Sequence, residues 1–84
     1  MSVIKLFSTG CERCLVVEGM LDAQGFVYEY HDLNGNEGFR SLDEEYRKQQ
    51  LVMRPSQALP VLVQGDMLWE GQDAVVCLEE EELV

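Results

Sequence analysis

A C-x-x-C motif, Cys11 to Cys14, follows directly on the apolar run of residues 3–7. The run predicts a buried β-strand, and the residues that begin at Cys11 have the pattern of a helix. Cysteines three residues apart on a helix lie one turn apart on the same face. At the start of that helix the first sulfur faces unpaired backbone N–H groups and the positive end of the dipole, which favours a thiolate. The motif therefore predicts a strand, a tight turn and a helix that present a reactive thiol with a second thiol beside it.

The same spacing has two other readings, a metal site and a structural pair without turnover. A closed zinc site needs four ligands, usually two C-x-x-C pairs or two added histidines. Only Cys77 and His31 remain, and they stand apart in the sequence. Redox chemistry is therefore favoured, with Cys11 as nucleophile, Cys14 as resolving thiol and no bound metal. We expect Cys77 to be a small buried hydrophobe and His31 to be a surface or capping residue.

Length and composition set the broad class. A chain of 84 residues with 46% hydrophobic residues predicts one folded domain over 1–84. It has no apolar run long enough to cross a bilayer, and the opening MSVIKLFSTG does not resemble a signal peptide. Three cysteines without an export signal predict a reducing, cytoplasmic compartment. A net charge of −10 argues against nucleic acid or an anionic membrane as partner, and we expect a monomer.

The first half of the chain predicts two strands and two helices. Strands are expected over 3–7 and 26–31, with a loop over 32–36 between the second strand and the second helix. The first helix covers 11–24, with Leu15, Val17 or Glu18, and Leu21 on one stripe and Gly25 as its stop. Gly19 inside it suggests a close approach by another element, because glycine weakens a helix. A capping box at 41–44 predicts that the second helix begins there and runs through Met53 to the stop at Arg54-Pro55.

The second half predicts a hairpin and a last helix. Strands are expected over residues 61–63 and 67–69, joined by a tight turn at 64–66. Asp73 can cap a helix over 74–78. The glutamates that follow lie at the negative end of the helix dipole, so this helix should end early. The order is β-α-β-α-β-β-α. Its first two strands should be parallel and its closing hairpin antiparallel, in a four-stranded mixed sheet with three helices.

This order and four local motifs resemble the glutaredoxin branch of the thioredoxin fold, over nearly the whole chain. The motifs are residues 7–14, Leu59-Pro60-Val61, Gly65 in the hairpin turn, and Gly71-Gln72-Asp73. The resemblance implies an α/β, thioredoxin-like (glutaredoxin) fold. It also implies a thiol-disulfide oxidoreductase of electron transport, whose redox-active centre cycles between a dithiol and a disulfide bond. The expected partners are disulfide-containing proteins, and either glutathione or a flavoprotein reductase.

The resemblance also assigns roles around the two thiols. It implies that the Leu59-Pro60 bond is cis and faces the C-x-x-C, and that the Leu59 backbone pairs with an extended thiol substrate. Gln72 and Asp73 would hold the γ-glutamyl end of glutathione, a co-substrate rather than a tightly bound cofactor. Trp69 has two equal readings, as a cover of the substrate groove or as ordinary hairpin packing.

Two departures from the family bear on glutathione. Residues 8–10 contain no basic residue where glutaredoxins usually have one, and Glu70 adds a negative charge beside the expected docking strip. Both predict weak binding of glutathione, with Arg54 as the one cation considered for a substrate carboxylate. Trp69-Glu70-Gly71 resembles the Trp-Ser-Gly of redoxins that take electrons from thioredoxin reductase and serve ribonucleotide reductase. That redoxin is one alternative, and a non-enzymatic module that holds zinc or a shared iron–sulfur cluster is the other.

Overall fold

The computed structural model describes residues 3–50 and 58–83. Arg54, considered above for a substrate carboxylate, lies outside the described residues. Four strands and three helices alternate in the expected order within the described ranges. They are β1 (Ile4–Ser8), α1 (Glu12–Ala23), β2 (Tyr28–Asp32), α2 (Asn36–Lys48), β3 (Val61–Gln64), β4 (Met67–Glu70) and α3 (Gln72–Glu79).

The strands form one mixed sheet in the order β2-β1-β3-β4. The β1–β2 pair is parallel, with Leu6 opposite Tyr30, and α1 supplies the crossover that a parallel pair needs. The β1–β3 and β3–β4 pairs are antiparallel, with Leu62 opposite Leu6 on one side and Trp69 on the other. The predicted element order and mixed sheet are confirmed, and the layout is α/β and thioredoxin-like.

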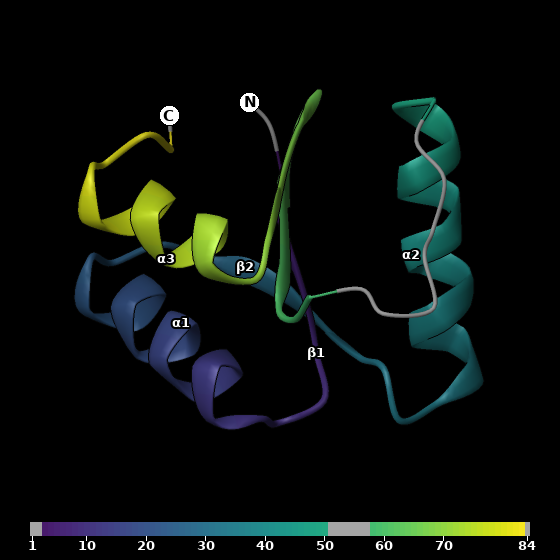
Figure 1. Ribbon diagram of the computed structural model, residues 1–84, viewed down its shortest axis with the longest axis horizontal. Coiled ribbons are helices and arrows are strands. Elements are labelled where there is room, and N and C mark those ends of the chain that lie inside the picture. Colours follow the sequence, from purple (N-terminus) through teal and green to yellow (C-terminus); the bar gives the residue numbers. More distant parts are fainter. Residues whose placement is uncertain (1–2, 51–57, 84) are drawn as a thin grey trace.

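Helices cover both faces of the sheet, with α1 and α3 on one face and α2 on the other (Figure 1). Because side chains alternate along a strand, neighbouring residues of β1 enter different cores. Leu6 lies in the cluster formed with α1 and α3, whereas Phe7 lies in the cluster that contains Leu42 and Tyr46 of α2. None of the helices in the described ranges has the length and apolarity needed to span a bilayer.

The start of α2 differs from the capping-box prediction. The helix begins at Asn36 after an extended Gly35, and the predicted box at 41–44 lies inside it. The turn before it explains the difference, because the Asp32 carboxylate accepts the Asn34 N–H at 2.9 Å and the Asp32 carbonyl accepts the Gly35 N–H at 3.3 Å. This turn directs the chain into the helix at once. The helix ends at Lys48, and the predicted stop at residues 53–55 lies outside the described residues.

Smaller differences concern single positions. In α1 the buried residues are Cys14, Val17 and Leu21, whereas Leu15 is exposed, so its place on the buried stripe was wrong. Within the described residues, no atom of another element lies within 4 Å of a Cβ built on Gly19, so the suggested close approach at that position is also wrong.

Most element boundaries differ from the prediction by one or two residues, and two of these differences are at element starts. The second strand begins at Tyr28, two residues later than predicted. The last helix is capped by Gly71 rather than Asp73, which lies in its first turn.

Candidate active site

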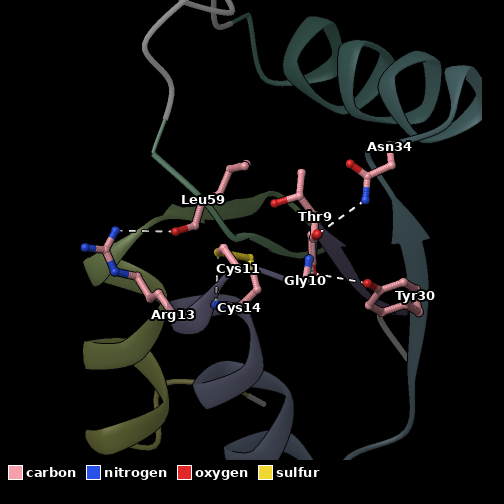
Figure 2. Close-up of a disulfide and its surroundings, with 9 residues drawn as sticks. Thr9, Gly10, Cys11, Arg13, Cys14, Tyr30, Asn34 and Leu59 are labelled. Carbon is pink, nitrogen blue, oxygen red and sulfur yellow. Dashed lines mark hydrogen bonds between the residues drawn. A yellow bond between two sulfur atoms is a disulfide. The ribbon is translucent and has the colours of Figure 1, made fainter.

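The two motif cysteines occupy the start of α1, with Cys11 as its N-cap and Cys14 inside its first turn. The extended backbone of Cys11 turns its Sγ toward the helix end, where it accepts the backbone N–H of Cys14 at 3.2 Å (Figure 2). Cys11 is half-buried, whereas Cys14 is fully buried. The two form a disulfide. Cys11 is therefore the sulfur that an external disulfide can reach, and Cys14 lies behind it.

The turn between β1 and Cys11 is fixed by hydrogen bonds from β2 and the turn that follows it (Figure 2). The buried Ser8 Oγ accepts the Gly10 N–H at 3.0 Å and lies 3.2 Å from the Tyr30 hydroxyl. The Asn34 side-chain amide donates to the Thr9 carbonyl at 3.3 Å. These contacts hold the approach to Cys11 in one conformation. The sequence analysis missed them, since nothing in the local pattern pairs Ser8 with a residue on the neighbouring strand.

The proline loop lies against the start of α1. The Leu59-Pro60 peptide bond is cis, which confirms the prediction. The Pro60 carbonyl accepts the Gly71 N–H at 2.8 Å and so ties the loop to the start of α3. Pro60 itself is buried, whereas Leu59 is half-buried and reaches the cavity at Cys11.

An open cavity of about 640 Å³ lies between α1, the proline loop and α3, and we call it the groove. Its lining residues are Cys11, Glu12, Arg13, Val16, Leu59, Gln72 and Val75. The structure thus brings Leu59 and Gln72, two of the predicted substrate residues, to the same groove as Cys11. Trp69 and Asp73 do not line the groove: Trp69 packs on the core beneath α1 and α3, and Asp73 is exposed in the first turn of α3.

Arg13 bridges the two sides of the groove. Its Nη1 donates to the Leu59 carbonyl at 3.4 Å, so the guanidinium lies over the proline loop (Figure 2). A Cβ added at Gly71 would come within 3.0 Å of the same nitrogen, so the absence of a side chain there makes room for it. The sequence places Arg13 beside the cysteines but gives no signal for a contact with a residue 46 positions away.

Glu70 was expected to add negative charge beside the docking strip, and this was wrong. Its carboxylate accepts a hydrogen bond from the Tyr46 hydroxyl of α2. Neighbouring residues of a strand point to opposite faces, so Trp69 faces α1 and α3 while Glu70 faces α2. The charge of Glu70 therefore lies on the far side of the sheet from the groove.

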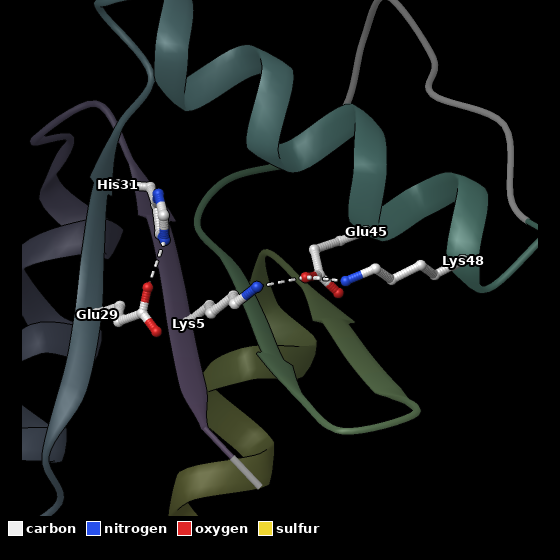
Figure 3. A network of polar contacts seen from close by, with 5 residues as sticks. All are labelled: Lys5, Glu29, His31, Glu45 and Lys48. Atoms are coloured by element: carbon white, nitrogen blue, oxygen red, sulfur yellow. Dashed lines mark hydrogen bonds and ion pairs between the residues drawn. The ribbon is translucent and has the colours of Figure 1, made fainter.

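The remaining cysteine lies in the core under α1 and α3, and the histidine is half-buried on β2. Burial, with a smaller contribution from the charge of Glu82, raises the pKa of the Cys77 thiol to about 11, so this buried thiol stays protonated. His31 is half-buried and stacks on Phe7, and its Nε2 lies 3.5 Å from a Glu29 carboxylate oxygen (Figure 3). Among residues 3–50 and 58–83, no three or more His, Cys, Asp or Glu side chains gather as a metal ion would require.

Comparison with protein-family models, curated proteins and solved structures found no match to this chain.

Proposed function

We propose that the chain is a glutaredoxin-like thiol-disulfide oxidoreductase that uses Cys11 and Cys14. The main support is the N-cap position of the Cys11 sulfur, which accepts a backbone N–H and opens on the groove. In the reduced protein the same N–H and the helix dipole stabilise negative charge on this sulfur, and the thiolate is the nucleophile in disulfide exchange. Glu12 opposes this charge and Arg13 supports it.

The reaction proceeds through a mixed disulfide. The Cys11 thiolate attacks one sulfur of a substrate disulfide, the S–S bond breaks, and the leaving thiolate takes up a proton. Cys14 then loses its proton and attacks the Cys11 sulfur, which releases the second substrate thiol and forms the Cys11–Cys14 disulfide. Two electrons and two protons pass to the substrate. The buried position of Cys14 behind Cys11 suits the second attack, because Cys14 is in reach of Cys11 and out of reach of solvent.

The backbone beside the groove offers a docking strip for the substrate. Leu59 lines the groove next to Cys11, so an extended segment on either side of a substrate cysteine can pair with its main chain. Gln72 at the start of α3 contributes to the opposite wall. These contacts need no particular side chain on the substrate, in keeping with an enzyme that reduces several protein or small-molecule disulfides.

The reductant that restores the dithiol is either glutathione or a flavoprotein reductase. The proposal is tested by turnover of a small neutral disulfide with glutathione and its reductase, in parallel with thioredoxin reductase and NADPH. We expect turnover with at least one system, complete loss in Cys11→Ser, and retention in Cys77→Ala. Mild oxidation should remove two of the three thiols and reverse on reduction. The proposal fails if the dithiol does not turn over with either system, or if the purified protein carries zinc or a coloured cluster on these cysteines.

A further inference from the structure

Arg13 is the one cation among the residues that line the groove. The other positive side chains of the described ranges lie elsewhere. Lys5 and Lys48 approach Glu45, Arg47 pairs with Asp43 at 2.9 Å, and Arg40 is exposed on α2, which covers the other face of the sheet. A negative group on a docked substrate therefore meets the positive charge of Arg13 and the negative charge of Glu12, the two charged side chains that line the groove, and Arg13 is the one of them that can attract it. The distant charges that make up the net charge of −10 repel such a group less than nearby charges do, because salt screens interactions beyond about 8 Å.

The Arg13 guanidinium is held in position by one hydrogen bond and has N–H donors left for a ligand. A guanidinium has five N–H donors in a rigid fork, and within the described residues Arg13 uses one of them, in a long contact of 3.4 Å to the Leu59 carbonyl. The residue is exposed, so this contact can be exchanged for another at little cost. A carboxylate is the natural replacement, since it matches the fork and forms two charge-assisted hydrogen bonds.

The Leu59 carbonyl is also a group that an extended substrate would use. With Arg13 on it, the docking strip is partly occupied in the empty groove. A substrate carboxylate that draws Arg13 away would free this carbonyl for main-chain pairing. Binding of the substrate carboxylate by Arg13 would then favour binding of the substrate backbone by Leu59, and the reverse.

We propose that Arg13 is the specificity-determining residue of the groove and selects disulfides that carry a carboxylate near the reacting sulfur. This inference rests on the proposed function. The carboxylate can belong to a small thiol, such as the glycine end of glutathione, or to an acidic side chain beside a cysteine in a protein. Both present the same chemistry to the guanidinium.

The test compares two small disulfides of similar size, dithiodipropionate, which carries a carboxylate at each end, and hydroxyethyl disulfide, which is neutral. The measured quantity is the ratio of their rate constants with the reduced protein. Because both react with the same Cys11 thiolate, any effect of Arg13 on the reactivity of that thiolate cancels in the ratio. We expect Arg13→Gln to lower the ratio about fivefold, as for an exposed ion pair. Arg13→Lys should restore part of it, and added salt should reduce it in the native protein.

Arg40→Gln is the matched control, because it removes the same charge from an exposed site on α2. It should leave the ratio unchanged. Glutathione disulfide and a peptide disulfide with Asp beside its cysteine serve as separate arms, and the larger fall in Arg13→Gln, measured relative to the rate with hydroxyethyl disulfide, identifies the source of the carboxylate. An unchanged ratio in Arg13→Gln, or an equal fall in Arg40→Gln, would overturn the inference and leave the oxidoreductase intact. If no disulfide reacts with the native dithiol, the proposed function itself fails, and this inference with it.

Discussion

The three cysteines occupy three different environments, and these environments are expected to give their thiols different reactivities. Cys11 has an N-cap backbone and an opening to the groove, Cys14 lies one turn deeper with no exposure, and Cys77 lies inside the α1–α3 core. A thiolate needs hydrogen-bond donors or positive charge near it. Cys11 has both in the Cys14 N–H and Arg13, whereas burial raises the pKa of Cys77 to about 11.

Alkylation of the reduced protein should therefore label Cys11 first. At mildly acidic pH we expect iodoacetamide to modify Cys11 well before Cys77, because only the N-cap sulfur has the means to ionise there. Peptide mapping of partly labelled protein measures the order. A Cys11→Ser variant is the control and should lose the fast labelling, while Cys77 should react only in denaturant. Fast labelling at Cys77 would mean that the nucleophile has been misplaced.

At this scale the sequence predicts what is local and misses what is distant. The two cysteines lie three residues apart and the helix start follows them, so their roles can be predicted from their spacing. The position of Arg13 depends on Leu59, and that of Glu70 depends on Tyr46 in another helix. The local sequence around these residues contains no pattern that predicts either contact. Prediction from sequence therefore placed the two cysteines at the start of a helix but did not place Arg13 on the proline loop.

Among the elements, α1 and α2 differ in how closely a neighbour approaches their glycines. A Cβ on Gly19 of α1 would meet no atom within 4 Å, whereas a Cβ on Gly38 of α2 would lie 2.1 Å from the Asp32 carbonyl oxygen. The first helix tolerates a side chain at its glycine. The second can rest on the end of β2 only because Gly38 has none.

The two Gly→Ala substitutions should therefore have opposite effects on the free energy of unfolding. Gly19→Ala should raise it by up to about 1 kcal/mol, the helix preference of alanine over glycine. Gly38→Ala gains the same preference but forces backbone atoms apart, and we expect a net loss of about 2 kcal/mol. Urea unfolding followed by circular dichroism measures both. Equal gains in the two variants would show that α2 does not lie as close to β2 as the structure has it.

The elements also show why boundaries were harder to predict than the elements themselves. Apolar runs and spacing, together with turn and capping residues, predicted all seven elements. The start of α2 was predicted too late because Ser41 and Glu44 match the sequence pattern of a capping box. In the structure the turn at Asp32 precedes them, and the helix begins at Asn36. Several residues can begin a helix, and here the hydrogen-bonded turn at Asp32 precedes the observed start.

Across the whole molecule, the sheet separates two cores, and the helices on its two faces are held to it by different kinds of contact. The α1–α3 side is mainly apolar, whereas α2 is attached to the sheet partly by polar contacts. Lys5 of β1 donates to the Glu45 carboxylate at 2.7 Å, and Lys48 lies 3.5 Å from the same oxygen (Figure 3). The side chain of Glu45 is only 6% exposed, so this carboxylate depends on its cations. Without its cations Glu45 would be an unpaired and nearly buried negative charge, which is costly.

The Lys5–Glu45 pair should make stability depend on pH. Burial alone would raise the pKa of Glu45, but the hydrogen bond and charge of Lys5, with help from Lys48, outweigh it and hold the pKa below 4.5. The hydrogen bond to Glu45 in turn raises the pKa of Lys5 above 10.5. A carboxyl with a lowered native pKa stabilises the fold above its unfolded value and loses that contribution as the pH falls through the native pKa. A lysine with a raised pKa contributes below its unfolded value and loses that contribution as the pH rises through the native one.

Lys5→Met should therefore destabilise the protein at neutral pH and matter less in acid. We expect a loss of about 2 kcal/mol near neutrality, the size of a hydrogen bond to a charged group, because the buried Glu45 keeps only the more distant Lys48. The difference from the native protein should shrink in acid, as the pH falls through the lowered native pKa of Glu45 and the carboxylate takes up a proton. Lys48→Met is the matched control: its side chain is 65% exposed, and its loss should cost less than about 1 kcal/mol. Urea unfolding at a series of pH values measures both variants. A constant difference at every pH would show that Lys5 acts through the packing of its aliphatic chain and not through the charge of Glu45.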